Sequence, residues 1–144
     1  KQVGADRPRY QIAAESDFAA GRISALRSST SPEPRPVIYA IGQVLAPLGI
    51  ATEHGVGGPG PDVGPLVMLG VPWAQLAQDG TDYFDYHHTP DDTLDKIDPK
   101  ALDQQVAAYA AFAYLAAETT VDFGEAQKPA TPPTPDPRRA PSAR

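Results

Sequence analysis

Cysteine is missing from the 144 residues of this sequence, and long apolar runs and positive charge are in short supply. Without cysteine there can be no disulfide framework, no thiolate metal site and no cysteine nucleophile. The most apolar stretch, residues 107–117, is interrupted by tyrosines and falls well short of the roughly 20 residues that a membrane span needs. Twelve Lys and Arg against eighteen Asp and Glu give a net charge of -6, which repels phosphate backbones. The sequence therefore excludes a membrane span and makes nucleic acid a poor partner.

The length and the proline distribution indicate one folded unit followed by a tail. A chain of this size buries a single core. Residues 124–144 contain six prolines and no large apolar side chain, so they bury too little surface to offset their ordering entropy. We predict a folded part over residues 1–123 and a disordered, proline-rich tail over residues 124–144. The sequence opens on Lys1 with neither Met nor a leader, so we expect either processing or a longer parent protein.

Two helices are marked in the sequence. Residues 99–118 carry apolar side chains at three- and four-residue spacing, with Asp98 as N-cap and Pro99 at the first helical position. The stripe that predicts its buried face consists of Leu102, Val106, Tyr109, Ala110, Ala113 and Ala117. A second helix is predicted over residues 36–48, because Gly49 follows its last periodic residue.

Short extended segments are predicted at residues 10–14, 49–53 and 72–76, each bounded by turn residues. Strands and helices therefore alternate, which indicates an α/β fold with helices over a sheet. Trp73 and Met68 are expected in the core. A long polar segment, residues 78–98, separates the last strand from the last helix, and loops of this length are usually functional.

A histidine pair, His87 and His88, lies in this polar segment. Neutral imidazole is the commonest metal ligand in proteins and usually needs a carboxylate or carbonyl on its second nitrogen. Asp92 is the candidate partner. The alternative interpretation is a solvated acidic loop in which two histidines are adjacent by chance.

Acidic side chains also follow the first predicted strand. Residues 13–17 run from an apolar segment directly into Glu15 and Asp17. Acids at the carboxyl end of a strand in an α/β sheet lie where ligands bind. The alternative is a strand end that turns into solvent.

A literal G-x-G-x-x-G pattern is formed by Gly55, Gly57 and Gly60, after a predicted strand. Pro59 and Pro61 remove N–H groups that should face a pyrophosphate, and no long helix follows. We therefore predict a mobile glycine-rich loop near a site instead of a nucleotide-binding fingerprint.

Two polar residues flank this loop. Asp62 follows it, and capping of a short helix over residues 63–69 is one interpretation of this aspartate. His54 precedes the loop, has no partner in the sequence and is predicted to be a loop histidine.

Three segments, taken in order, resemble the two-zinc exopeptidase family that includes bacterial leucyl aminopeptidases and plasma glutamate carboxypeptidase. Residues 14–17, Ala-Glu-Ser-Asp, are similar to the family's fourth ligand segment. Residues 60–66, followed by 70–72, resemble its Asp-containing loop before the penultimate strand. Residues 88–93, His-Thr-Pro-Asp-Asp-Thr, match its last ligand motif, His-Thr-x-x-Asp-Thr. The resemblance covers residues 10–118 and implies the family's C-terminal half, a mixed β-sheet flanked by helices.

The resemblance implies roles for five residues. Asp17 would bind one zinc ion and His88 the other. Asp92 would orient His88 through a hydrogen bond, and Asp62 would orient a neighbour of the site. His87 stands where many relatives have a Tyr that stabilises the oxyanion, and an imidazole N–H could donate the same hydrogen bond.

The family's chemistry needs more than these residues. Two zinc ions hold a hydroxide that attacks the peptide carbonyl, while a glutamate moves its proton to the leaving amine. Relatives carry the other three of five ligands, and this glutamate, on upstream segments that nothing in residues 1–9 matches. We therefore expect this chain to be inactive alone and to need the missing N-terminal part of its catalytic domain.

The expected parent is a periplasmic or extracellular exopeptidase that acts on peptides, with amino- or carboxypeptidase action left open. The rival hypothesis is a non-catalytic peptide-binding or interaction domain that kept the fold and lost the metals.

Overall fold

The computed structural model describes residues 9–18 and 20–126. Most of the predicted tail therefore lies outside the described residues, and its disorder stays a prediction. The first part of that tail packs against the fold, because Ala126 donates its backbone N–H to the carbonyl of Gly70 at 3.1 Å. Within the described ranges, no helix is long and apolar enough to cross a membrane.

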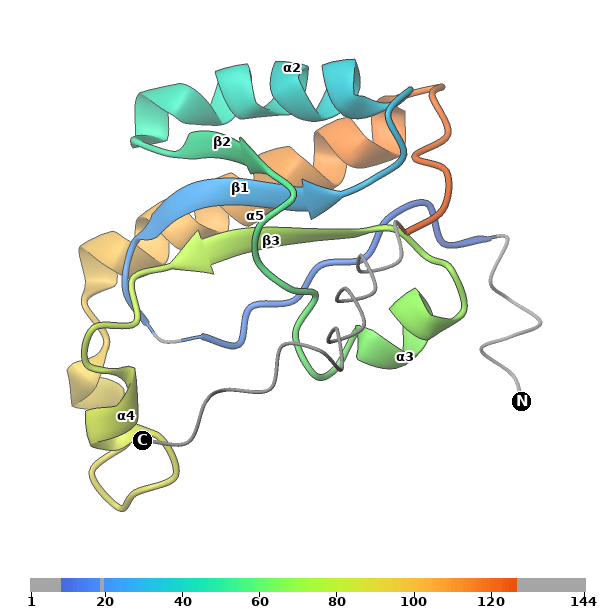
Figure 1. The fold of residues 1–144 in the computed structure, drawn as a ribbon. Helices are drawn as coiled ribbons and strands as arrows, with labels where there is room; N and C mark the ends of the chain where they lie inside the picture. The colour runs from blue at the N-terminus through green and yellow to red at the C-terminus, as the bar shows by residue number, and fades with distance from the viewer. Residues whose placement is uncertain (1–8, 19, 127–144) are drawn as a thin grey trace, which may run out of the picture.

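The centre of the fold is a mixed three-stranded sheet in the order β2-β1-β3. β1 (Ile23–Ser29) pairs in parallel with β2 (Ala51–His54) and antiparallel with β3 (Trp73–Gln78). Figure 1 shows β1 between its two neighbours. Beyond β3, an isolated parallel bridge joins Ala13 to Trp73. The predicted α/β architecture with a mixed sheet is confirmed.

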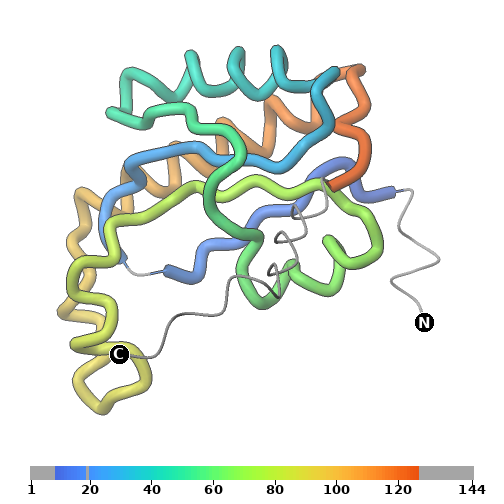
Figure 2. The backbone as a smooth tube through the Cα atoms, in the orientation of Figure 1, coloured from blue at the N-terminus to red at the C-terminus, as the bar shows by residue number. Residues whose placement is uncertain are grey.

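Two long helices cover one face of this sheet. α2 (Arg35–Leu45) and α5 (Pro99–Glu118) pack against each other, and Figure 2 shows α2 along the top of the view and α5 passing behind the strands. The core between helices and sheet includes Leu26 and Leu76 from the strands and Ile38 and Phe112 from the helices, all almost completely buried. Burial of such side chains contributes roughly 1.5 to 3 kcal/mol each.

The extent of α5 is confirmed and its predicted buried face is wrong. Asp98 caps the helix by accepting a hydrogen bond from the backbone N–H of Lys100 at 3.0 Å. Leu102 and Val106, from the predicted stripe, are exposed. The buried face instead consists of Ala101, Gln104, Gln105, Ala108, Phe112 and Ala116. Two glutamines can lie on that face because their amides hydrogen-bond to backbone groups of the sheet side.

Other elements differ from expectation at their ends. The second predicted helix begins at Arg35 and ends at Leu45, and a 3-10 turn, η2 (Ala46–Leu48), leads to Gly49 with a φ of 81°. The predicted strand over residues 10–14 is reduced to the single bridge at Ala13. The central strand β1 was not predicted at all.

The short helix α3 (Gly64–Met68) lies below the sheet in Figure 1. Its Leu66 packs on a small second core of Ala13, Val63 and Val71. Met68 is therefore on the opposite side of the helix and is 89% exposed, so the prediction of a core methionine is wrong. Trp73 is buried, as predicted.

Candidate active site

The segment that carries Asp17 ends beside the last residue of β3. Ala13 exchanges two backbone hydrogen bonds with residues 72 and 74, which aligns the segment in parallel with β3. Further along, the Gln78 side chain donates to Ser16 Oγ at 3.2 Å and accepts from the Phe18 N–H at 3.2 Å. Gln78 therefore holds both neighbours of Asp17 at the carboxyl end of β3.

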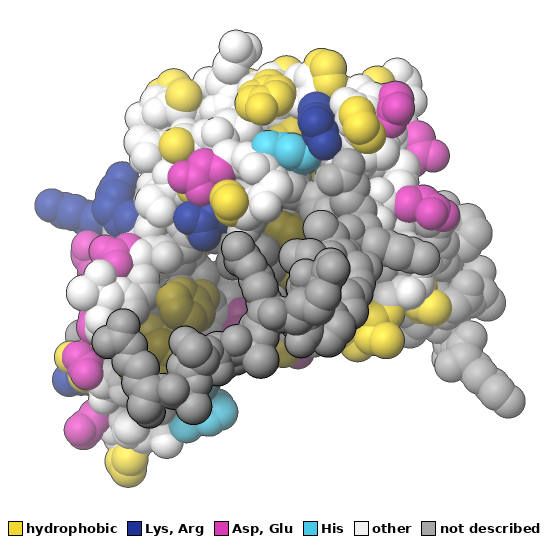
Figure 3. Space-filling model, in the orientation of Figure 1, with side chains coloured by type: hydrophobic (Ala, Val, Ile, Leu, Met, Phe, Trp, Pro, Cys, Tyr) yellow, Lys and Arg dark blue, Asp and Glu magenta, His cyan; other side chains and the backbone are white. Residues whose placement is uncertain are grey.

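The polar segment after β3 folds back over this point. It contains the short helix α4 (Tyr83–Tyr86) and the 3-10 turn η3 (Leu94–Lys96) before α5 begins. In Figure 3, acidic side chains and a histidine gather at the end of the molecule that carries α4. A cavity of about 330 Å³ lies between α4, α5 and the Asp17 segment. Asp17, His87 and Asp92 all line it, so three predicted site residues meet there.

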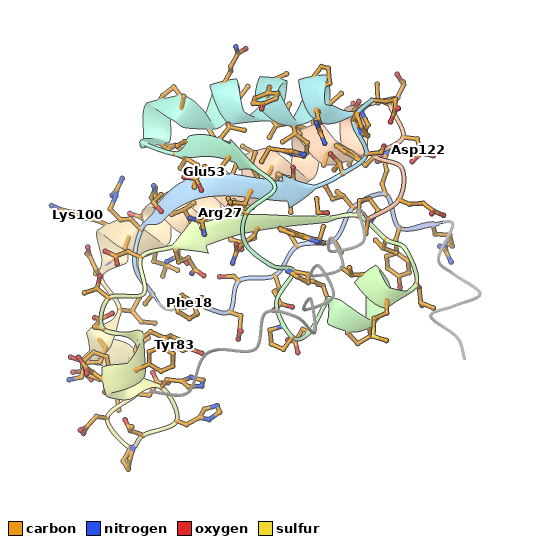
Figure 4. The ribbon with its side chains drawn as sticks, in the orientation of Figure 1. Phe18, Arg27, Glu53, Tyr83, Lys100 and Asp122 are labelled. Atoms are coloured by element: carbon orange, nitrogen blue, oxygen red, sulfur yellow. The ribbon has the colours of Figure 1, made fainter. Side chains whose placement is uncertain are left out.

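A row of stacked rings joins the two predicted ligand segments. Phe18 stacks on Tyr83 with ring centroids 4.4 Å apart, and Figure 4 shows these two side chains next to each other. Tyr83 stacks on His87 at 4.4 Å, and His87 on His88 at 3.7 Å. Stacking of this kind favours one relative orientation of neighbouring rings. The stack therefore orders His87 and His88 relative to the residue that follows Asp17.

Tyr83 is also the polar centre of this group. Its hydroxyl lies 3.3 Å from Nε2 of His87. Desolvation raises the pKa of Tyr83, and the negative charges of Asp17 and then Asp92 raise it further. The hydroxyl therefore keeps its proton and can donate it to His87 or to a ligand.

His88 has the backbone conformation that is typical of a functional position. Its φ of 58° lies in the left-handed region, the one positive value outside glycine among the described residues. Such strain costs on the order of 1 to 3 kcal/mol and concentrates at active sites. The turn is held by Thr89, whose Oγ1 donates to the carbonyl of Tyr86 at 2.7 Å. The side chain of His88 is exposed next to the cavity.

The predicted supporting aspartates lie in different places. Asp92 lines the cavity, but within the described ranges no hydrogen bond joins its carboxylate to His88. Asp62 is exposed and outside the cavity. It does not cap α3 either, because Val63 is the N-cap and no side chain caps that helix. Glu15 takes the Val63 N–H instead, at 2.7 Å.

Asp17 and His88 carry the kinds of atom that bind a transition metal, but two side chains are fewer than a metal site needs. Carboxylate oxygen and imidazole nitrogen are ordinary zinc ligands, and zinc normally takes three or four from the protein. Over residues 9–18 and 20–126, no group of three His, Asp or Glu side chains lies close enough to hold a metal ion. Asp17 and His88 are therefore at most part of a metal site.

Three residues that organise this region were not predicted to do so: Tyr83, Glu15 and Gln78. Glu15 and Tyr83 stand beside or within the motifs already singled out, so proximity in sequence was the available signal. For Gln78 the sequence carries no signal, because its partners lie about 60 residues earlier and 27 residues later in the chain.

The curated proteins that this chain resembles share one name, carboxypeptidase Q. No model of a known protein family matches the chain. Carboxypeptidase Q from Bos taurus is 31% identical over 114 residues, which are 79% of this chain and 24% of that protein. The Homo sapiens carboxypeptidase Q is 31% identical over 109 residues, 76% of this chain and 23% of that protein. The chain thus spans about a quarter of the length of these curated relatives.

One solved structure is closely similar. A peptidase M28 precursor from Shewanella amazonensis superposes with a TM-score of 0.83 at 47% sequence identity. The match covers 89% of this chain and 29% of that one.

Proposed function

This chain is a homologue of the M28 peptidases, and on that premise we propose that residues 1–123 form the C-terminal part of the catalytic domain of a two-zinc exopeptidase. Its substrates are peptides, from which it removes terminal residues. The observation that carries the proposal is the cavity of about 330 Å³ that Asp17, His87 and Asp92 all line, with His88 stacked on His87.

Each residue at the cavity has a role in this proposal. Asp17 and His88 are the metal ligands, one for each ion, and Asp92 orients His88 once the metal is bound. A bound zinc ion supplies Lewis acidity and a water nucleophile at neutral pH. His87 donates a hydrogen bond to the oxyanion that forms at the peptide carbonyl. Tyr83 selects the tautomer of His87 in this proposal: its hydroxyl lies 3.3 Å from Nε2, and a hydroxyl that donates there leaves the imidazole proton on Nδ1.

Asp62 belongs to this proposal as a supporting residue outside the cavity. Its exposed carboxylate follows the glycine-rich loop and can orient a group that another part of the catalytic domain brings to the site. The 144-residue chain alone is proposed to be inactive, since it supplies two of the five ligands and no general base. The parent acts outside the cytoplasm, in the periplasm or the extracellular space.

The test uses the full-length protein that contains this chain, with Asp17→Ala and His88→Ala variants. His54→Ala is the matched control, because His54 lies at the end of β2, away from the cavity. Bound zinc is measured by mass spectrometry and hydrolysis with peptides blocked at either terminus. We expect each ligand variant to lose zinc and more than about 100-fold in kcat/KM, and the control to keep both. Unchanged zinc and stability in both ligand variants would favour the non-catalytic binding domain. The blocked peptides decide between amino- and carboxypeptidase action.

A further inference from the structure

Glu15 connects three parts of the fold around the segment that carries Asp17. Its Oε2 accepts a hydrogen bond from the backbone N–H of Val63 at 2.7 Å, which joins the segment to the loop before α3. Its backbone carbonyl accepts from the Tyr109 hydroxyl of α5 at 2.6 Å. Glu15 precedes Asp17 by two residues, so both connections are made next to the proposed ligand.

The loop between β2 and α3 lies tightly against the polar face of the sheet. Gly60 has a φ of 86°, and a Cβ built on it would overlap Glu15 Oε1. Gly57 has a φ of 92°, and its Cβ would overlap the Gln75 amide oxygen and approach Arg27 Cδ to 2.9 Å. Gly58, between them, has open space around its Cβ position and no positive φ. The approach of the loop to Glu15 therefore depends on Gly60 and is independent of Gly58.

A second cavity, of about 340 Å³, lies beneath this loop. Its wall includes Pro59, Gly60 and Pro61, and its floor includes Glu15 and Asp17. Asp17 lines this cavity and the first one. Residues 59–61 therefore line the same cavity as Asp17, the proposed metal ligand.

The carboxylate of Glu15 is poorly explained by stability alone. Its Oε1 is buried and has no hydrogen-bond partner among the described residues. Arg27, the cation at the same cavity, is engaged through its Nε by Glu53 Oε2 at 2.7 Å, and Figure 4 shows this pair on neighbouring strands. A buried acceptor without a partner costs free energy, so stability alone does not account for a carboxylate at this position.

We propose that Glu15 is a positioning residue that holds residues 59–61 as a wall of the substrate cavity beside Asp17. In that place the wall sets how well the terminal side chain of a peptide fits. The inference rests on the proposed function, and it assigns Glu15 to substrate fit and not to metal binding.

The test compares Glu15→Ala, Glu15→Gln, Gly60→Ala and the control Gly58→Ala in the full-length protein. We expect Glu15→Ala and Gly60→Ala to raise KM about tenfold with kcat within about threefold and zinc content unchanged. Glu15→Gln keeps an acceptor for Val63, so it should restore most of the lost fit. Gly58→Ala should behave as wild type.

Three results would overturn the inference: an unchanged KM in Gly60→Ala, an unchanged KM in Glu15→Ala, or loss of zinc in either variant. If Glu15→Ala does not fold, Gly60→Ala and Glu15→Gln decide. If the wild type hydrolyses no peptide, the proposed function fails, and hydrogen exchange at the Val63 amide still tests the wall. Exchange should be faster in Glu15→Ala and Gly60→Ala than in Gly58→Ala, and equal exchange would contradict the role of Glu15.

Discussion

Tyr83 touches more of the candidate site than either proposed metal ligand does. Its ring is stacked between Phe18 and His87, its hydroxyl reaches His87, and the charges of Asp17 and Asp92 act on it. Through these contacts, the Tyr83 side chain links the segment that carries Asp17 to the segment that carries His87 and His88. Its two functions, stacking and hydrogen bonding, can be separated by substitution.

Tyr83→Phe keeps the stack and removes the hydroxyl. We expect kcat of the full-length protein to fall about tenfold with little change in KM, because the tautomer of His87 is no longer fixed. Steady-state kinetics with a peptide substrate measures this. Tyr39→Phe is the control, since Tyr39 is half exposed on α2. An unchanged kcat in Tyr83→Phe would show that the hydroxyl has no part in positioning His87.

His54 gives the fold a defined response to acid. Burial lowers the pKa of His54 below its usual 6.5, and the charge of Arg35 lowers it further. As pH falls through 6.5, the unfolded state therefore binds the proton first, and the free energy of unfolding decreases. We expect thermal unfolding to occur at lower temperature at about pH 5.5 than at about pH 7.5, and His54→Gln to reduce this difference. An equal difference in variant and wild type would contradict this role.

At the scale of elements, α5 is tied to the sheet by a buried amide. Gln104 accepts from the Ile23 N–H at 2.8 Å and donates to the carbonyls of Ile23 and Leu48 at 2.9 and 3.0 Å. The residue is only 5% exposed, so water cannot replace these bonds. This amide therefore fixes the start of β1 and the end of η2 against one helix.

Gln104→Met keeps the volume and removes the hydrogen bonds. We expect it to lower the free energy of unfolding by about 2 to 3 kcal/mol, because backbone groups of Ile23 and Leu48 are left buried without partners. Urea unfolding of this variant and of Gln43→Met, an exposed position on α2, provides the comparison. A loss equal to that of the control would show that the amide contributes nothing.

Elements whose signal is local could be predicted from the sequence. The first and last residues of α5 could be predicted from the periodicity of residues 99–118 and from the cap at Asp98. Its buried face was not predictable, because glutamines are buried there by hydrogen bonds to distant backbone. β1 was missed because Ala25 and Leu26 are buried in succession and Ser28 is a polar residue at a buried position, so the alternation of apolar and polar residues is interrupted. In the structure, a register shift between Ile23 and Ala25 accompanies this interruption.

The candidate site was predictable where a motif carries it and not where packing does. Asp17, His87, His88 and Asp92 follow from motifs, and the fold brings three of them to one cavity. The stack of Phe18 on Tyr83 depends on side-chain directions 65 residues apart, which periodicity cannot give. The link from Glu15 to the Val63 backbone leaves no mark in the sequence for the same reason.

For the whole molecule, the proposed function makes this chain one side of a larger site. Helices α2 and α5 cover one face of the sheet, and the cavities lie at the carboxyl end of β3 and on the polar face. The two curated relatives compared above are about four times longer than the matched segment. In our proposal, the remaining metal ligands come from a part of the catalytic domain outside the matched segment.

The most direct measurement is a crystal structure of the full-length protein with zinc, using anomalous scattering to locate the metal. The account predicts two zinc ions, one about 2 Å from a carboxylate oxygen of Asp17 and the other about 2 Å from a ring nitrogen of His88. Zinc bound elsewhere, or no zinc at these two side chains, would contradict it.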